Sequence, residues 1–214
     1  MDEYWGVMNQ HFLKLRQNFK ADMMARYAVD EQLFDETSRC IAHLAVPFAV
    51  RRGELLQRVG QASREVFWLT GGVARVGYVS EGGNEVTMRF ATESHIANAY
   101  EDLLEFRGEL PARSFIVAET SVQGFRFDWE QMSMARSQHP VLTAYMTRVL
   151  EFAVCSQARR FITHTASSAE ERLANFRNEY PNLERRISQK VLASYLQITP
   201  AYLSQLMRRE QEAA

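Results

Sequence analysis

The segment 187–209, ISQKVLASYLQITPAYLSQLMRR, constrains the fold of this chain more than any other stretch. Its spacing predicts two helices joined by a tight turn at 196–198. Ser188 and Thr199 suit the N-cap positions of the two helices, and Pro200 suits a first helical position. The positions that a helix-turn-helix buries are small or apolar throughout; they are Leu192, Ala193, Leu196, Ile198, Leu203 and Leu206. The segment therefore predicts a helix-turn-helix.

The second predicted helix has one continuous polar face. At about 100° per residue, its polar side chains form a single arc opposite Leu203. In such an arc Gln can pair with adenine, Arg with guanine, and Ala can touch a thymine methyl group. The start of the helix and nearby basic residues suit phosphate oxygens. The predicted contacts to double-stranded DNA are Thr199, Pro200, Ala201, Ser204, Gln205, Arg208, Arg209 and Lys190, with Arg185 and Arg186 as further phosphate contacts. The alternative is a structural helical hairpin with a solvated polar face.

The charge distribution agrees with this prediction, although the net charge of the chain is only −1. Residues 1–156 carry 16 Lys and Arg against 20 Asp and Glu, whereas residues 157–214 carry 9 against 6. The basic excess thus lies on the segment with the helix-turn-helix pattern, where a modest positive field suits phosphate.

The first 130 residues change from a helical to a β pattern. Apolar residues recur every three or four positions over 2–28 and again over 30–44, which predicts helices. Short apolar or alternating runs between 45 and 127, separated by glycine turns such as 80–84, predict an antiparallel barrel or jelly roll. We therefore predict an α+β fold class, with N-terminal helices and an antiparallel β jelly roll over residues 1–130.

We predict a long dimerisation helix over residues 131–165, within which Pro140 suits a first-turn position, and a helix-turn-helix domain over residues 166–214. The long helix is apolar on two faces, one of which follows a heptad-like spacing. Because both faces must be buried, we expect one to pack on the jelly roll and the other on a second copy in a homodimer. The alternative is a helix buried within a monomer. The heptad positions are Leu142, Met146, Val149, Ala153, Ser156 and Arg160, and the second flank is Val141, Tyr145 and Phe152.

These motifs resemble the Crp/Fnr superfamily of bacterial transcription regulators over nearly the whole chain. The stretch 171–204 is the most specific part, and residues 52–56, 66–75 and 83–87 resemble the cyclic-nucleotide-binding jelly roll. The resemblance implies an effector domain, a dimer helix and a C-terminal helix-turn-helix that reads a palindromic site in the major groove. It also implies RNA polymerase as a further partner.

The effector pocket departs from the family pattern. Members that bind cyclic AMP have a Gly-Glu pair and then an Arg-Ser pair, whereas residues 97–102 here contain no Gly-Glu. Arg113-Ser114 is present but displaced by one residue, and a buried cyclic phosphate needs both a cation and aligned N–H donors. We therefore predict that cyclic AMP is not bound, and that the pocket takes an unknown small-molecule effector or is filled by side chains. The positions that correspond to the family pocket are Asn98, Ala99, Arg113, Ser114 and Gln157.

Two further departures concern the helix-turn-helix. The turn position that is usually Gly is Gln197 here, so we expect its backbone to avoid positive φ or to carry slight strain. The family's β-hairpin wing after the recognition helix is not contained in the 214 residues. We expect the phosphate contacts of such a wing to come from elsewhere or to be absent.

Several other kinds of function are excluded or disfavoured. Two distant cysteines, Cys40 and Cys155, exclude a disulfide scaffold, a four-cysteine iron–sulfur site and a zinc finger. No two histidines have metal-ligand spacing, and no nucleophile elbow or phosphate-binding glycine loop is present. We therefore expect no metal, no cofactor, no catalytic residue and no enzyme activity.

The remaining expectations concern location and local surfaces. The N-terminus lacks a signal-peptide pattern and no apolar run is long enough for a membrane span, so we expect a cytoplasmic protein without a membrane partner. We expect Cys155 to be a buried thiol on the dimer helix. The acidic run Glu101, Asp102, Glu105 and Glu109 predicts a solvated helix face. The competing function is a small-ligand sensing or protein-interaction module whose helix-turn-helix is only structural.

Overall fold

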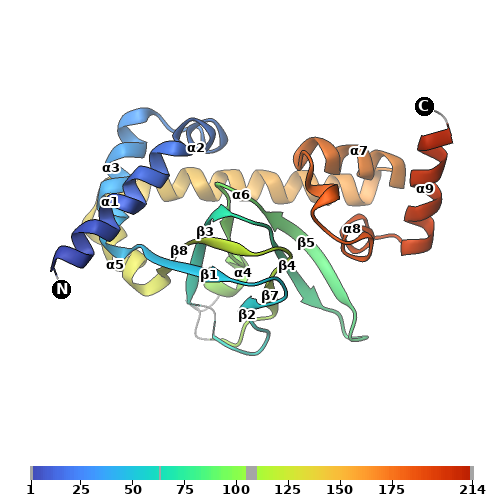
Figure 1. Ribbon diagram of the computed structural model, residues 1–214, viewed down its shortest axis with the longest axis horizontal. Coiled ribbons are helices and arrows are strands. Elements are labelled where there is room, and N and C mark those ends of the chain that lie inside the picture. Colours follow the sequence, from blue (N-terminus) through green and yellow to red (C-terminus); the bar gives the residue numbers. More distant parts are fainter. Residues whose placement is uncertain (1, 63, 105–109, 213–214) are drawn as a thin grey trace.

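The computed structural model describes residues 2–62, 64–104 and 110–212. One long helix runs along the N-terminal helices, the β sheets and the C-terminal helices (Figure 1). The N-terminal helices lie at one end, the β sheets in the middle, and a small helical domain at the other end. No helix within the described residues is both long and apolar enough to cross a membrane.

The N-terminal region is helical, as predicted. The expected helix over 2–28 is broken at Phe19, and Asp30 caps the next helix by accepting a hydrogen bond from the Leu33 N–H at 2.7 Å. The elements are α1 (Asp2–Asn18), α2 (Lys20–Tyr27), α3 (Glu31–Ile41) and the 3₁₀ turn η1 (Ala42–Leu44).

The β region forms two four-stranded antiparallel sheets that face each other, which confirms the predicted jelly roll. The glycine turn at 80–84 joins two paired strands, with Ala74 opposite Ala91 and Val79 opposite Glu85. One sheet has the order β1 (Val46–Val50), β8 (Val122–Asp128), β3 (Glu65–Gly71), β6 (Ile96–Ala97). The other has the order β2 (Leu55–Gln57), β7 (Ser114–Ala118), β4 (Ala74–Val79), β5 (Glu85–Ala91).

Side chains fill the space between the two sheets. Alternation along β3 sends Phe67 and Leu69 into this interior and sends Trp68 to the outer face, against the N-terminal helices. Gly72 has a φ of +94°, and a Cβ there would lie 2.2 Å from the Ser121 carbonyl oxygen, so this turn requires glycine. The sequence pattern did not predict the short strand β6, whereas the helix α4 (Tyr100–Leu104) contains Glu101 and Asp102 of the acidic run that was expected on a helix.

The predicted helix over 131–165 is two helices, α5 (Trp129–Gln138) and α6 (Pro140–Ala166). His139 is extended between them, with φ −125° and ψ 99°. Pro140 explains the break, because proline lacks the N–H that a continuing helix would need and clashes with the preceding turn.

Both predicted apolar faces of α6 pack largely inside the chain, which corrects the assignment of one of them to a second copy. Leu142 and Val149 from the heptad spacing and Tyr145 from the second flank are all buried in the core with the N-terminal helices. The exposed apolar side chains of α6 lie on another face, where Val154, Phe161 and Ile162 are 67%, 71% and 60% exposed.

The C-terminal domain has the predicted helix-turn-helix. Its first helix begins with a capping box between Ser168 and Glu171, and Ser188 accepts a hydrogen bond from the Val191 N–H at 3.2 Å. All six predicted packing positions lie inward, with Ile198 only partly buried. The elements are α7 (Ala169–Glu179), η3 (Leu183–Arg185), α8 (Gln189–Leu196) and α9 (Pro200–Glu212).

This C-terminal domain is docked on strand β5. The ring of Phe90 packs among Phe176, Tyr180 and Tyr195, at centroid distances of 6.0, 5.7 and 5.4 Å. The Ser194 hydroxyl accepts from the Thr87 N–H at 3.0 Å, so α8 also caps an edge of the second sheet. The position of α9 is therefore fixed relative to the jelly roll.

Candidate nucleic-acid interface

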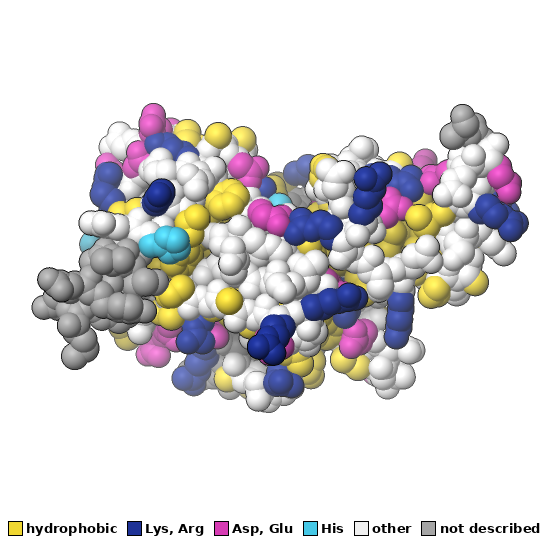
Figure 2. Space-filling view, in the orientation of Figure 1, with side chains coloured by type: hydrophobic (Ala, Val, Ile, Leu, Met, Phe, Trp, Pro, Cys, Tyr) yellow, Lys and Arg dark blue, Asp and Glu magenta, His cyan; other side chains and the backbone are white. Residues whose placement is uncertain are grey.

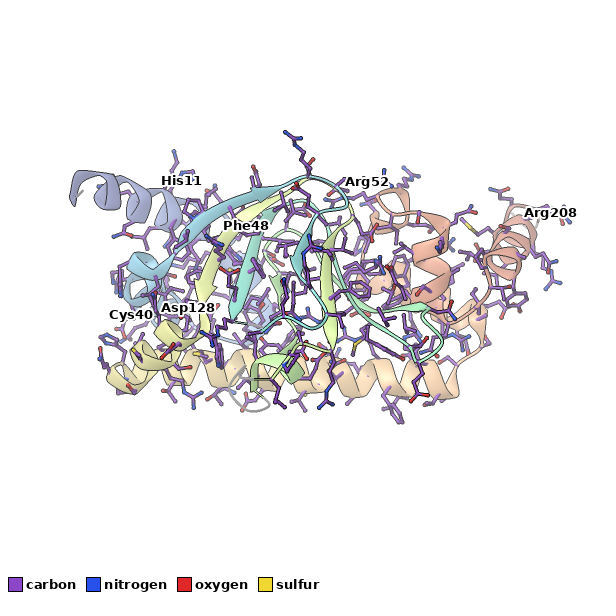
Figure 3. The ribbon with its side chains drawn as sticks, turned by 90° about the horizontal axis from the view of Figure 1, so that it is seen from below. His11, Cys40, Phe48, Arg52, Asp128 and Arg208 are labelled. Atoms are coloured by element: carbon purple, nitrogen blue, oxygen red, sulfur yellow. The ribbon has the colours of Figure 1, made fainter. Side chains whose placement is uncertain are left out.

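Helix α9 buries one face and exposes the other. Leu203 and Leu206 are buried against α8, while the predicted arc faces solvent along the whole helix. Figure 3 shows Arg208 at the far end of the molecule, pointing away from the jelly roll. The exposed arc consists of Ala201, Ser204, Gln205, Arg208 and Arg209, which are predicted DNA contacts on this helix.

The polar side chains of α9 and its cap differ in whether they are already hydrogen-bonded within the chain. The Thr199 hydroxyl accepts from the Tyr202 N–H at 3.1 Å as the helix cap, and the Ser204 hydroxyl donates to the Pro200 carbonyl at 3.0 Å. Arg208 and Glu212 lie 3.5 Å apart with both side chains more than two-thirds exposed. Such a pair contributes little and does not hold the guanidinium in place. Arg208 is thus available to a ligand.

Arg186 is not a free phosphate contact, which corrects its prediction. Its two terminal nitrogens donate to the two carboxylate oxygens of Glu93 at 2.6 and 3.0 Å. Partial burial would raise the pKa of Glu93, but the hydrogen bonds from Arg186 hold that pKa below its usual value. Arg186 therefore joins the C-terminal domain to the jelly roll.

Ion pairs within residues 157–214 reduce the number of unpaired cations in this segment. Arg160 pairs with Glu179, and Arg177 pairs with both Glu184 and Glu210. Figure 2 accordingly shows basic and acidic side chains interspersed over this end of the molecule. Among the residues that the structure describes, five cations of this segment are in no ion pair. Arg172 is bonded to backbone carbonyls, and the other four are Arg159, Arg185, Lys190 and Arg209. Lys190 is exposed and lines a hollow beside Arg52 and Glu85 of the jelly roll.

Arg172, which lies outside the predicted DNA contacts, supports the turn of the helix-turn-helix. Its Nε donates to the Leu196 carbonyl at 2.9 Å, and its Nη1 donates to the Ser167 carbonyl at 2.8 Å. These carbonyls end α8 and follow α6, so one guanidinium ties the turn to the long helix. The spacing of residues in the sequence does not indicate that an arginine outside the predicted DNA face will bond to these two carbonyls.

The turn residue Gln197 adopts φ 55° and ψ 44°, so positive φ is not avoided. A left-handed backbone costs a non-glycine residue about 1–2 kcal/mol. A glycine at this position would avoid that cost. Glycine also loses more conformational entropy on folding, which offsets part of the stability gained. We expect Gln197→Gly to raise the free energy of unfolding by about 0.5–1 kcal/mol. Urea unfolding measures it, and Gln205→Gly in the middle of α9 is the matched control, which should lower stability by up to about 1 kcal/mol. A lower stability for Gln197→Gly would contradict the strain at this turn.

The five predicted effector positions do not form one site. Asn98 is buried and accepts from the Arg89 guanidinium at 2.7 Å, and Ala99 is buried between the sheets. Arg113 is exposed, while the buried Ser114 hydroxyl donates to Glu101 at 2.8 Å. Gln157 lies on α6 over a separate hollow and accepts from Arg160 at 3.2 Å.

A carboxylate of the chain itself occupies the N–H donors at Arg113-Ser114. Asp102 accepts from the Arg113 N–H at 2.9 Å, from the Ser114 N–H at 3.0 Å and from the Gln57 amide at 2.8 Å. Asp102 is therefore buried, which corrects its assignment to a solvated face. The other members Glu105 and Glu109 lie outside the described residues.

Neither cysteine is in a disulfide, and Cys155 is exposed in the single chain, contrary to the expected buried thiol. Within the described residues, no group of three or more His, Cys, Asp or Glu side chains is placed to hold a metal ion.

Comparisons with known proteins bear on the fold alone. No protein-family model matches the chain, and no curated protein matches its sequence. Solved structures do match. FixK2 from Bradyrhizobium japonicum has a TM-score of 0.66 at 14% identity, covering 79% of this chain and 85% of that one.

Two further structures match over similar lengths. A putative regulator of the Crp/Fnr family from Eubacterium rectale has a TM-score of 0.65 at 13% identity, covering 87% of this chain and 85% of that one. The regulator CLP from Xanthomonas campestris, described as responsive to c-di-GMP, has a TM-score of 0.63 at 10% identity, covering 83% and 92%. The chain therefore has the fold of the Crp/Fnr-type transcription regulators.

Proposed function

We propose that this protein is a sequence-specific DNA-binding transcription regulator, and not an enzyme. The observation that carries the proposal is the exposed polar arc of α9, held outward by buried leucines on its other face. Gln205 and Arg208 would read base edges in the major groove. Arg185, Lys190 and Arg209, which are free of ion pairs within the described chain, would contact phosphates.

The active form in this proposal is a homodimer that reads a palindromic site. Val154, Ala158 and Phe161 recur at heptad spacing along the exposed face of α6, with Cys155 beside them. Pairing of two such helices would bury this face. Because α7 and α8 pack on the end of α6 and on β5, the angle between two α6 helices would set the distance between two α9 helices. Adjacent major grooves on one side of DNA are about 34 Å apart.

The jelly roll in this proposal does not take cyclic AMP. Asp102 already holds the N–H groups of Arg113 and Ser114, and side chains fill the interior between the sheets. A cyclic phosphate would have to displace a buried carboxylate and would meet like charge in doing so. RNA polymerase is the further partner expected of a regulator, and the cytoplasm is its expected location.

The test is a selection of bound DNA from a random pool, with and without cyclic AMP. We expect a palindromic site with two half-sites one helical turn apart, enriched equally in both arms. Binding should weaken steeply with salt, because phosphate contacts release counterions. Enrichment that depends on cyclic AMP would contradict the proposal that Asp102 excludes this ligand from the jelly roll. Absence of any salt-dependent DNA affinity would favour the rival function, a small-ligand sensing or protein-interaction module.

A further inference from the structure

A hollow of about 350 Å³ lies where the long helix meets the C-terminal domain, between the second half of α6 and the helices α7 and α8. Figure 1 shows α7 and α8 gathered beside this end of α6. The described residues that line the hollow include none of the five predicted effector positions. Its volume is in the usual range for small-molecule sites, so it is a separate candidate for a ligand.

Positive charge exceeds negative charge around this hollow. Arg159, Arg160 and Arg172 line it, whereas Glu179 is the single carboxylate among its described lining residues. The two oxygens of Glu179 are already taken, because they accept from Arg160 and from the Tyr195 hydroxyl, each at 3.1 Å. Arg159 and Arg172 are in no ion pair with a described residue. Three arginines and one glutamate therefore leave a formal charge of +2 in the wall.

The pKa of His164, in the same wall, agrees with this positive field. Burial lowers the pKa of His164, and the charges of Arg172 and Arg160 lower it further. Glu179 raises this pKa, but its effect is the smallest of the four. His164 is therefore neutral near neutral pH and adds no charge to the hollow.

Several polar side chains around the hollow are free to bind a ligand. Arg159 is exposed, and the Nη2 of Arg172 makes no hydrogen bond with a described residue, because only its Nε and Nη1 donate to backbone carbonyls. The side chains of Ser156, Thr163 and Asn175 also have no hydrogen-bond partner among the described residues. Guanidinium, hydroxyl and amide groups all donate, so an anionic acceptor would satisfy them together.

We propose that this hollow binds a small phosphate monoester. The phosphate would lie between Arg159 of α6 and the free Nη2 of Arg172 of α7. The hydroxyls of Ser156 and Thr163 would donate to it as well. A phosphate monoester carries nearly two negative charges at neutral pH, which matches the formal charge of the wall, whereas a carboxylate carries one.

The hollow also has room for the organic part of such an ester. An apolar cavity of about 150 Å³ accommodates benzene, so more than twice that volume accommodates a ring together with a phosphate. Phe152 of α6 is partly exposed in the wall and offers an apolar surface to this group. A ring-bearing phosphate monoester is therefore the probe that fits the site.

The position of the ligand predicts its effect. It would join α6 to α7, and Arg172 also holds the turn of the helix-turn-helix through the Leu196 carbonyl at 2.9 Å. A bound phosphate would therefore favour one angle between α6 and α9. Arg159 lies about 100° around the helix from Ala158 of the proposed dimer face, so the ligand and a second copy would not compete. An effect on DNA affinity rests on the proposed function above, whereas binding of the phosphate does not.

The test is a calorimetric titration of the full chain with phenyl phosphate, without DNA, at about pH 7.5 and constant ionic strength. Benzenesulfonate has the same ring with a single charge, and phenol has the ring with no charge. We expect saturable binding of phenyl phosphate and a raised melting temperature. Benzenesulfonate should bind at least about tenfold more weakly, and phenol should not bind measurably.

Variants test the assignment of the donors. Arg159→Gln should weaken phenyl phosphate binding at least about tenfold, and Ser156→Ala should weaken it about fivefold. Arg159 is exposed, so its replacement leaves the fold intact, and Arg172 is left unchanged because it holds the turn. The matched control is Arg136→Gln, an exposed arginine of α5 that forms no ion pair with a described residue. It should bind phenyl phosphate like the wild type.

Three results would overturn the proposal: no saturable binding of phenyl phosphate, equal affinity for benzenesulfonate, or wild-type affinity in Arg159→Gln. Operator binding measured without ligand separates this site from the DNA interface. Arg159→Gln should then bind operator like the wild type, and a loss would assign Arg159 to the DNA backbone and also overturn the proposal. Phenyl phosphate should change the operator affinity of the wild type about fivefold or more, but not that of Arg159→Gln. If the wild type bound no operator, the DNA-binding function would fail while the calorimetric result still decided this site.

Discussion

Phe161→Asp should leave the protein monomeric and weaken its binding to a palindromic operator by roughly 10²-fold or more. Phe161 is 71% exposed on α6, beside Val154 and Ile162, so an aspartate there would not disturb the core of the chain. In a dimer of α6 helices the same aspartate would place two unpaired carboxylates in an apolar seam. The second half-site would then be bound independently, and the gain from linking two binding events would be lost.

Mass measured by light scattering and operator affinity measured by fluorescence anisotropy give the two readouts. The matched control is Val59→Asp, which makes the same kind of change at a 47% exposed apolar position of the jelly-roll domain. It should remain a dimer with normal affinity. A dimeric Phe161→Asp that binds operator like the wild type would show that this face of α6 is not the subunit contact.

A second readout comes from Cys155, which lies beside the same face. In a dimer the two thiols would come close together or be shielded by the partner helix. The wild type should therefore either form a disulfide between chains or react slowly with a thiol reagent, while the monomeric variant should react as an exposed cysteine. This contact would also reconcile the expected burial of the thiol with its exposure in the single chain.

Local chemistry explains why the helix-turn-helix could be predicted from the sequence. Ser188 and Thr199 act as caps, and Leu192 and Leu203 lie inward, because capping and helical period depend on residues within a few positions of one another. Glycine turns likewise located the strands of the jelly roll. The α+β class followed from these signals.

The face of α6 that we propose as the dimer contact could not be predicted in the same way. The spacing of Leu142 and Val149 is as compatible with the N-terminal helices as with a second copy, and packing alone decides between them. Phe161 and Val154 also follow a heptad spacing, but the pattern does not reveal that the described residues leave both side chains exposed.

Long-range polar contacts could not be predicted from the sequence for a similar reason. Asp102 is buried because donors from 57 and 113–114 converge on it, and Arg172 is placed by carbonyls at both sides of a domain junction. A charged residue in a polar stretch is usually solvated. Only the fold brings together the donors or acceptors that make it structural.

Gln205→Ala and Arg208→Ala should each weaken specific DNA binding by about 1–3 kcal/mol, because each removes a side chain suited to bidentate base contact. Both side chains are exposed on α9, so neither change should alter the melting temperature by more than a small amount. Each variant should also relax discrimination at one base pair of each half-site. Competition binding against operators with single substitutions measures both effects.

The controls separate base reading from general attraction to DNA. Gln211→Ala is a matched change on the same helix outside the predicted arc, and it should bind like the wild type. Arg209→Ala, a phosphate contact in this proposal, should weaken binding to all sequences alike and lower the salt slope by about one. If Gln205→Ala and Arg208→Ala behaved like Arg209→Ala, α9 would lie against the backbone of the duplex, and the bases would be read by another element.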